Sequence, residues 1–326
     1  MIRRAPFDIY VAACDRKGGI YHFKTDFFGD GLPLKLYSYT PLDRPMFLTF
    51  EGNKLHAVLR APFWDSPNSG VMSFDIAEDG KLYNPSRLTQ TGGVVGCHLS
   101  AVGGRVYVAN YVSGSVFATP NTLVTHQGSS VHPTRQTSAH THFVSPTPDG
   151  KYMFAVDLGM DKIIVYDMNL NKVSEASVPA GNGARHVVFD AWGKYAYCVC
   201  ELSSSVSIFT YEDGKFTFVR DVPALPENFH GESTAAAIRY YKGYLLVSHR
   251  GADCISFFLA RGERLVRVQD FPCGGHSPRD FDLFDNHIIV TNESGDVCVL
   301  RPDQREFYKE VLDLRYMKNP LCVIGR

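Results

Sequence analysis

The chain has 326 residues, of which 44% are hydrophobic and 21% charged, and its formal net charge at pH 7 is −1. This balance, without any basic run or tail, lacks the electrostatic footprint of nucleic-acid binding. No stretch approaches the roughly 18 apolar residues of a membrane span, and the amino-terminal residues lack the apolar core of a signal peptide. We therefore expect a cytoplasmic protein that binds neither nucleic acid nor membranes.

The eight cysteines are scattered along the chain and form no C-x-x-C pair. Cys198 and Cys200 are two positions apart, so on a strand they would share one face. We interpret them as packing residues and expect reduced thiols, as in a cytoplasmic protein.

Seven segments share one pattern, in which an apolar strand, a polar turn and a second apolar strand follow one another. In chain order they are DIYVAACDRKGGIYHF from Asp8, LHAVLRAPFWDSPNSGVMSF from Leu55, VYVANYVSGSVFAT from Val106, MFAVDLGMDKIIVYD from Met153, AYCVCELSSSVSIF from Ala196, YLLVSHRGADCISFF from Tyr244 and HIIVTNESGDVCVL from His287. Such segments are typical of β-hairpins. Their starts lie 43 to 51 residues apart, which is the period of a four-stranded propeller blade.

Each hairpin also has a strand before it and a strand after it. In the fourth copy the four strands read HTHFVSP, KYMFAVD, KIIVYDM and KVSEASVP. No amphipathic helix pattern of useful length appears between the strands, and an α/β fold would need one.

The two ends of the chain complement each other. The chain opens on the second strand of a blade, DIYVAA, and closes on NPLCVIGR, which resembles the first strands RPMFLTFE and ARHVVFDA. The sequence therefore predicts that residues 1–326 form a single all-β domain, a seven-bladed β-propeller of four-stranded antiparallel blades. Its C-terminal strand would complete the N-terminal blade. A two-domain β protein is the alternative.

Propeller geometry selects the candidate site residues. The first strand of each blade lines the central channel. Because chain direction alternates, the connections between blades lie at the same mouth as the turns between second and third strands. The first group supplies His98, His140, His142, Arg185, His186, Glu232, His276 and Arg279, and the second supplies Asn110, Asp157, Glu201, Arg250 and Asn292. The turns at the other mouth (PDGK, DAWGK, NLNK, EDGK) are ordinary reverse turns.

Four segments carry a resemblance to a known family: HTHFVSPTPDGKYMFAVDLGMDKIIVYD, GNGARHVVFDAWGKYAYCVCELSSSVSIF, LLVSHRGADCISFF and HSPRDF. They resemble the seven-bladed propeller lactonases, which include bacterial 6-phosphogluconolactonases and fungal carboxymuconate-lactonizing enzymes. The resemblance extends over nearly the whole chain. It implies a metal-independent site, without a cofactor, at one channel mouth, and a small anionic lactone or sugar acid as substrate.

The family motifs map onto this chain with some departures. The histidine motif matches His140 and His142. The Pro-Arg-His motif matches 184–186 without its proline, Asn-Glu-Leu matches 200–202 without its asparagine, and Ser-Asn-Arg-Gly matches 248–251, again without its asparagine. Where the family often carries an acid before an isoleucine, this chain has Ala237, and the nearest acid is Glu232. Because the charged residues of the motifs are kept and only their neighbours differ, we expect these departures to change which substrate binds more than where the site lies.

We assign catalytic roles to His140, His142, Arg185, Glu201 and Arg250, and substrate binding to His98, Asn110, Asp157, His186, Glu232, His276 and Arg279. The arginines would grip an anion with two hydrogen bonds each. A histidine would act as the general base, and Glu201 would orient it or act as the base itself. A second histidine or an arginine would stabilise the oxyanion.

Four alternatives stay open. The arginines could form internal ion pairs that bridge blades. His140 and His142, on one strand face, could bind a metal ion with Glu201 or Glu232. The same groups could run a cycloisomerase or lyase reaction. The propeller could also be a non-catalytic binding scaffold.

Two single residues also have a structural reading. Asp157 could cap a turn, and His98 could be a buried structural residue. The sequence does not indicate an oligomeric state.

Overall fold

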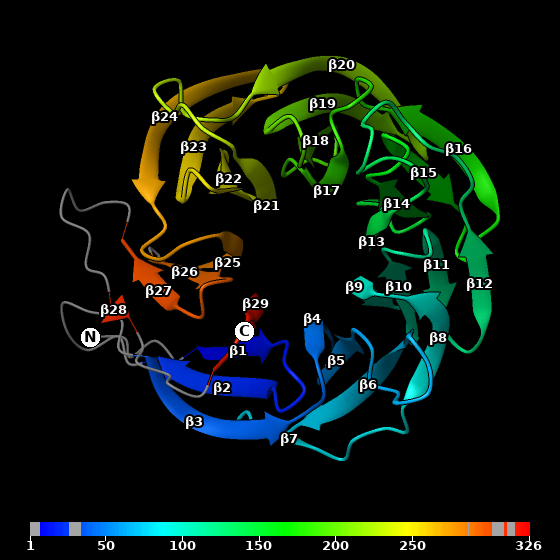
Figure 1. Cartoon of the computed structure of the whole chain (residues 1–326), viewed down its shortest axis with the longest axis vertical. Coiled ribbons are helices and arrows are strands. Elements are labelled where there is room, and N and C mark those ends of the chain that lie inside the picture. Colours follow the sequence, from blue (N-terminus) through cyan, green and yellow to red (C-terminus); the bar gives the residue numbers. More distant parts are fainter. Residues whose placement is uncertain (1–6, 26–33, 286, 302–309, 312–316) are drawn as a thin grey trace.

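The computed structural model describes residues 7–25, 34–285, 287–301, 310–311 and 317–326, so the amino-terminal residues 1–6 lie outside the described part. Seven antiparallel sheets surround a central channel (Figure 1). The described residues contain no helix, and therefore none long and apolar enough to cross a membrane. This confirms the predicted fold.

The strands are numbered in chain order, and blades 1 to 7 follow the ring from the N-terminal sheet. The innermost strands of blades 1 to 7 are β29 (Pro320–Gly325), β4 (Pro45–Glu51), β9 (Gly96–Val102), β13 (Thr141–Pro146), β17 (Ala184–Phe189), β21 (Thr234–Tyr241) and β25 (Pro278–Phe284). The second strands are β1 (Asp8–Ala13), β5 (Lys54–Leu59), β10 (Arg105–Asn110), β14 (Met153–Asp157), β18 (Tyr195–Cys200), β22 (Tyr244–Arg250) and β26 (His287–Asn292).

The third strands are β2 (Gly19–Thr25), β6 (Asn68–Ile76), β11 (Ser115–Ala118), β15 (Lys162–Tyr166), β19 (Ser205–Glu212), β23 (Cys254–Arg261) and β27 (Val297–Leu300). The outer strands are β3 (Leu34–Pro41), β7 (Leu82–Tyr83) with β8 (Thr89–Val94), β12 (Thr122–Thr125), β16 (Lys172–Ser177), β20 (Lys215–Pro223), β24 (Arg264–Pro272) and β28 (Glu310–Val311). In blade 2 the outer strand is split, because β7 and β8 both pair with β6.

The last strand closes the ring. β29 pairs antiparallel with β1, with Val323 opposite Val11 and Gly325 opposite Ile9. Figure 1 shows this red C-terminal strand beside the blue first strand. The predicted closure, in which the C-terminal strand completes the N-terminal blade, is confirmed.

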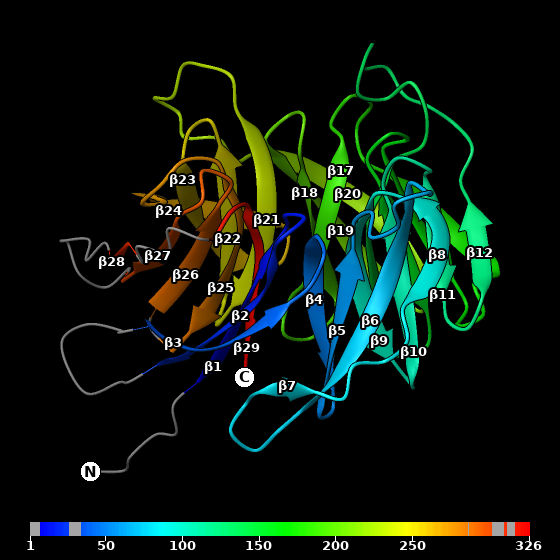
Figure 2. The same ribbon diagram turned by 60° about the horizontal axis from the view of Figure 1, so that its bottom comes forward.

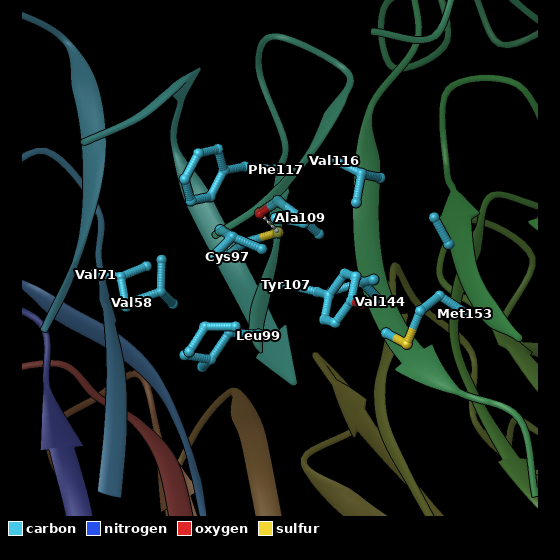
Figure 3. Packing of buried hydrophobic residues seen from close by; sticks show 14 of the residues in the cluster. Val58, Val71, Cys97, Leu99, Tyr107, Ala109, Val116, Phe117, Val144 and Met153 are labelled. Carbon is cyan, nitrogen blue, oxygen red and sulfur yellow. Dashed lines mark hydrogen bonds between the residues drawn. The ribbon is translucent and has the colours of Figure 1, made fainter. Parts of the chain in front are cut away.

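The core lies between neighbouring blades. Second strands such as β14 are buried along their whole length, whereas the outer strand β16 alternates between exposed and half-buried residues. Figure 3 shows one such core, where Val58 of blade 2, Leu99 and Tyr107 of blade 3 and Val144 of blade 4 pack together. Burial of each large apolar side chain contributes about 1.5–3 kcal/mol, so this packing holds the inner strands in fixed positions around the channel.

A β-bulge near the start of each inner strand positions the site. In every blade the ladder between first and second strands skips at least one residue of the inner strand: Leu321, Met46, Cys97, His142, Arg185, the pair Ala236 and Ala237, and Arg279. A bulge bends the strand and re-aims a side chain. All of these residues except the two alanines line cavities of the channel.

Candidate active site

A pocket of about 310 Å³ opens at one channel mouth. Inner-strand bulges contribute Met46, Cys97, His142 and Arg279, and the ends of second strands contribute Arg60, Tyr111, Glu201 and Arg250. Arg135 comes from the connection between β12 and β13, which rises at the same end of the ring as the connection between β20 and β21 (Figure 2). The volume is at the small end for ligand pockets and suits a sugar-sized molecule.

Glu201 is the centre of an ion-pair network. Its Oε1 accepts a hydrogen bond from Arg135 Nη2 at 2.6 Å, and its Oε2 lies 3.0 Å from Arg185 Nε and 3.1 Å from Arg250 Nη2. Burial opposes ionisation of Glu201, but Arg250 and Arg185 hold its pKa well below the usual range. Both oxygens of Glu201 are paired with arginines and its pKa is lowered, so the carboxylate stays ionised at neutral pH. It therefore holds the arginines in place and is a poor proton acceptor.

Arg185 lies beneath the pocket and is 2% exposed. Its Nη1 donates to the carbonyl of Ala236 at 2.7 Å, which is the carbonyl freed by the blade 6 bulge. Burial, together with the charges of Arg279 and Arg250, lowers the pKa of Arg185 to about 9, so it stays charged at neutral pH. Its guanidinium is therefore a fixed positive charge below the pocket floor.

Arg250 and Arg279 line the pocket, and each is paired with a carboxylate through part of its guanidinium only. Arg250 Nε is buried without a hydrogen-bond partner among the described residues, while Nη2 donates to the carbonyl of Ala235 at 3.3 Å. Arg279 Nη1 donates to Glu293 at 2.9 Å, and no contact is recorded for its Nη2 within the described chain. A guanidinium that lines a pocket is a strong donor for a carboxylate, phosphate or oxyanion.

His142 lines the pocket and is 4% exposed. Its Nδ1 has no hydrogen-bond partner among the described residues. Burial and the charge of Arg185 lower its pKa well below the usual value, although Glu201 opposes this. The imidazole is therefore neutral at pH 7 and has a free nitrogen with which to accept a proton.

The other sequence-predicted histidines lie elsewhere. His140 stacks on the Tyr111 ring at 4.7 Å, and its Nδ1 lies 3.1 Å from the Tyr111 carbonyl oxygen, outside the pocket lining. His140 precedes β13, and both imidazoles contact the Tyr111 ring, His142 with a centroid distance of 5.6 Å, but only His142 lines the pocket. Within the described residues, no group of three or more His, Cys, Asp or Glu side chains is arranged to hold a metal ion.

His98 and His186 lie one layer deeper than predicted. Together with Phe47 and Phe143 they form an aromatic plug, with ring centroids 4.2 Å apart for Phe47 and His98 and 4.9 Å apart for Phe143 and His186. All four rings line a second cavity that opens at the opposite mouth. The plug therefore separates the two mouths. Neither imidazole lines the pocket that holds Arg60, Arg135, Arg250 and Arg279, which we call the arginine pocket.

Comparison with known proteins agrees with this architecture. The family described as "Lactonase, 7-bladed beta-propeller" matches residues 8–323. This chain belongs to that lactonase family. An uncharacterized protein of Staphylococcus epidermidis is 31% identical over 312 residues, covering 88% of this chain and 90% of its own length. One from Staphylococcus aureus is 31% identical over 314 residues, covering 89% and 90%.

Two solved structures share the fold. A provisionally named 6-phosphogluconolactonase from Bacteroides fragilis has a TM-score of 0.85 at 24% identity and covers 100% of this chain and 99% of its own. The periplasmic gluconolactonase of Pseudomonas aeruginosa has a TM-score of 0.85 at 24% identity and covers 98% and 99%.

The departures from the lactonase motifs lie one residue away from the pocket. Cys200 and His249 stand where the motifs have asparagine, and both are buried at the last ladder position of their strands. Cys200 Sγ lies 3.5 Å from Ser207 Oγ, whereas neither ring nitrogen of His249 has a hydrogen-bond partner among the described residues. Since the next residues, Glu201 and Arg250, reach the pocket, the departures leave its charges in place.

Asn110 and Asp157 stand at the same place in their own blades, the last ladder position of the second strand, and both are buried. Asn110 accepts from Thr91 Oγ1 at 2.9 Å. Asp157 Oδ2 lies 2.6 Å from His126 Nδ1, and Asp157 Oδ1 accepts from the backbone N–H of His140 at 2.8 Å. Both side chains are fully used in structural contacts, so their predicted binding role is not supported by position. Successive strand residues face opposite sides, so the pocket-facing positions are the ones that follow.

Glu232 and His276, also predicted for the site, lie on exposed surface and do not line the pocket. His276 Nδ1 lies 2.8 Å from Asp253 Oδ2, and its side chain is 82% exposed.

The sequence reasoning missed Arg60, Tyr111, Arg135 and Glu293. Arg60, Tyr111 and Glu293 follow the last ladder residue of β5, β10 and β26, as Glu201 and Arg250 do in their blades. Aligning the hairpins on Cys200-Glu201 would have found them. Arg135 has no such signal, because its connection has no counterpart of similar sequence in the other blades.

Proposed function

We propose that this protein hydrolyses a small anionic sugar lactone, of which 6-phosphogluconolactone is the representative. The arginine pocket carries the proposal: four arginines (Arg60, Arg135, Arg250 and Arg279) and one carboxylate, Glu201, line about 310 Å³ beside an unpartnered neutral imidazole. A surplus of positive charge favours an anionic ligand. The membership of the lactonase family supplies the reaction class.

In this proposal His142 is the general base. Its free nitrogen takes a proton from a water molecule, and the hydroxide adds to the lactone carbonyl carbon to give a tetrahedral oxyanion. Arg250, whose side chain lines the pocket, donates to the oxyanion. The intermediate then collapses, the ring C–O bond breaks, and the alkoxide that leaves takes the proton back from the imidazolium. The product is the open hydroxy acid.

Glu201 and Arg185 act as positioning residues. Glu201 holds Arg135, Arg185 and Arg250 in one arrangement, so the donors need no reorganisation when charge develops on the substrate. A bound anion also offsets the cations that depress the pKa of His142, which strengthens this base when the substrate is present.

The expected cytoplasmic location belongs to the same proposal. All eight cysteines lie in the described part of the chain, are buried and belong to no disulfide there, and a reducing compartment keeps thiols in that state.

The test is the hydrolysis of freshly prepared 6-phosphogluconolactone, measured with and without a chelator for the wild type, His142→Ala and Arg250→Ala. We expect chelator-resistant turnover, with each variant losing about 10²–10³-fold in kcat while its circular dichroism stays native. Chelator-sensitive turnover would assign His142 to a metal site. Absence of turnover on this lactone, with rearrangement of an unsaturated carboxylate ring instead, would contradict hydrolysis and favour cycloisomerase or lyase chemistry.

A further inference from the structure

Arg135 reaches the arginine pocket in a different way from its neighbours. It comes from the middle of residues 126–140, the connection from blade 3 to blade 4, whereas the other pocket residues lie in strands or directly follow one. This connection is the longest between blades in the described part of the chain. The Arg135 side chain is 39% exposed where it meets Glu201. An exposed ion pair of a long side chain is worth little, because water screens it and the side chain loses entropy. A fixed position for Arg135 therefore depends on its backbone.

One carboxylate holds both ends of this connection. At its start, His126 Nδ1 lies 2.6 Å from Asp157 Oδ2, and at its end the backbone N–H of His140 donates to Asp157 Oδ1 at 2.8 Å. Asp157 is fully buried, and the other ring nitrogen of His126 lies 2.6 Å from the Tyr166 hydroxyl oxygen. Breaking a buried network of this kind leaves polar groups unsatisfied, which is costly. The ends of the connection are therefore tied to blade 4.

Gln136 fastens the middle of the connection, one residue from Arg135. Its side chain is fully buried, its Nε2 donates to the Leu158 carbonyl at 2.8 Å, and its Oε1 accepts from the backbone N–H of His132 at 3.0 Å. The backbone N–H of Gln136 also donates to the His132 carbonyl at 3.2 Å, and that of Arg135 donates to His132 Nδ1 at 3.2 Å. Gln136 thus closes the turn 132–136 and ties it to the turn between β14 and β15.

Arg135 transmits this placement to the pocket. Its Nη2 donates to Glu201 Oε1 at 2.6 Å and to the Tyr111 hydroxyl at 3.2 Å. The other oxygen of Glu201 pairs with Arg185 and Arg250. A displaced Arg135 would therefore take a positive charge out of the pocket wall and remove the partner of one Glu201 oxygen.

We propose that Gln136 is a positioning residue that acts through Arg135 on the binding of the anionic substrate, while Asp157 holds the ends of the same connection. The proposal rests on the function proposed above. Gln136 and Asp157 do not line the pocket. They restrict the connection before the substrate arrives, so that less conformational entropy is lost on binding. The Arg135 charge favours the bound anion in the ground state and the transition state alike, so its displacement should raise KM and leave kcat nearly unchanged.

The kinetic test is a double-mutant cycle of Arg135→Gln and Gln136→Leu on 6-phosphogluconolactone. Arg135→Gln should reduce kcat/KM by about 10- to 100-fold, mainly through KM, as the loss of a charged hydrogen bond does. Gln136→Leu should reduce it by at least about fivefold, again through KM, and by no more than about twofold in the Arg135→Gln background. Losses that multiply in the double variant would show that Gln136 does not act through Arg135 and would overturn the proposal.

Tyr211→Phe is the matched control. The Tyr211 side chain is buried, and its hydroxyl donates to Asp149 Oδ2 at 2.9 Å and accepts from the backbone N–H of Gly214 at 3.0 Å. The substitution therefore removes one donated and one accepted hydrogen bond, as Gln136→Leu does, but among the reverse turns at the opposite mouth. It should leave kcat/KM within about twofold. A loss as large as that in Gln136→Leu would mean that any comparable damage to the fold impairs the pocket, and would also overturn the proposal.

A structural test separates the proposal from the activity. In the crystal structure of Gln136→Leu we expect the Arg135 guanidinium to have left Glu201 Oε1, whereas in Tyr211→Phe the contact of 2.6 Å should remain. If Gln136→Leu does not fold, Gln136→Glu replaces it in both tests, because it keeps the acceptor for His132 and removes the donor to Leu158. If the wild type hydrolyses no lactone, the proposed function fails, and this comparison still decides the role of Gln136. An unchanged contact between Arg135 and Glu201 in the Gln136 variant would overturn that role.

Discussion

The two mouths of the channel differ in both charge and size. The cavity at the second mouth is larger, about 560 Å³ against about 310 Å³. Apolar and aromatic side chains dominate its walls, and its one arginine, Arg239, is paired with Asp280 at 2.7 Å and lies 3.8 Å from Asp282. The smaller pocket concentrates arginines, a buried carboxylate and an unpartnered imidazole.

Strand direction explains this difference. Every inner strand starts at the mouth that holds the arginine pocket. The bulges of the inner strands, the ends of the second strands and the connections between blades therefore all meet there. Short reverse turns such as 147–150 and 190–193 form the second mouth. Loops and bulges can change without disturbing the packed strands, so the fold leaves one mouth free for chemistry. The following predictions test this division, beginning with the largest effect.

Glu201→Gln should be the most damaging change. It leaves Arg185 and Arg250 buried without their counter-charge, and breaking a buried pair in this way costs about 3–5 kcal/mol. We expect the free energy of unfolding in urea to fall by that amount, and kcat for lactone hydrolysis to fall at least about 100-fold. Glu293→Gln is the control. The Glu293 side chain is 35% exposed, so the loss of stability should be no more than about 1 kcal/mol. Equal losses in the two variants would contradict the central place given to Glu201.

His142→Asn should reduce kcat by about 10²–10⁴-fold, because it removes the general base. His276→Ala should stay within about twofold, since that ring lies on the surface with Asp253. Steady-state kinetics on both variants measures the contrast. A comparable loss in His276→Ala would show that the site extends beyond the pocket.

Lowering the pH should reduce the stability of the folded protein through the two histidines of the aromatic plug, His98 and His186. Burial lowers the pKa values of His98 and His186 below the usual value near 6.5, so the unfolded chain binds more protons than the folded protein as pH falls. Stability should therefore be full above about pH 6.5 and decline progressively below it. His98→Phe should reduce this decline, measured as the melting temperature between pH 7 and pH 5. An identical pH dependence in His98→Phe would contradict the assignment to the plug.

Asp282→Asn should have the smallest effect on activity. Burial raises the pKa of Asp282 to about 6, against the opposing charge of Arg239. A raised carboxyl pKa means that the folded protein loses stability as pH rises between about 4 and 6. The substitution should remove this dependence and leave kcat/KM within about twofold. A larger loss of kcat/KM would place part of the reaction at the second mouth.

The fold was predictable from the sequence because its signal repeats. Seven hairpins share one pattern of apolar strand, polar turn and apolar strand, and their number sets the number of blades. The last strand resembles the first strands of other blades, and this predicts how the ring closes. Strand direction predicted that the ends of the second strands and the starts of the inner strands would meet at one mouth, where Glu201, Arg250 and His142 line one pocket. Of the predicted catalytic residues, His142, Glu201 and Arg250 line the pocket, and Arg185 lies directly beneath it.

Single positions were less predictable, for two physical reasons. His140 precedes β13 and a bulge follows at His142, so strand alternation does not decide which imidazole lines the pocket, and only His142 does. A shift of one residue turns a side chain to the other face, so Asn110 and Asp157 pack inside while Tyr111 and Glu201 face the ligand space. Arg135 reaches Glu201 over a separation of 66 residues through a connection that no periodic pattern describes.

The most direct test of the central claim is a crystal structure of the protein with 6-phosphogluconate, the hydrolysis product. We expect the sugar acid in the arginine pocket, with its carboxylate at Arg250 and His142. The cavity at the second mouth should contain only water. Sugar acid bound in the cavity beside Phe143 and Asp282, with the arginine pocket empty, would contradict the account.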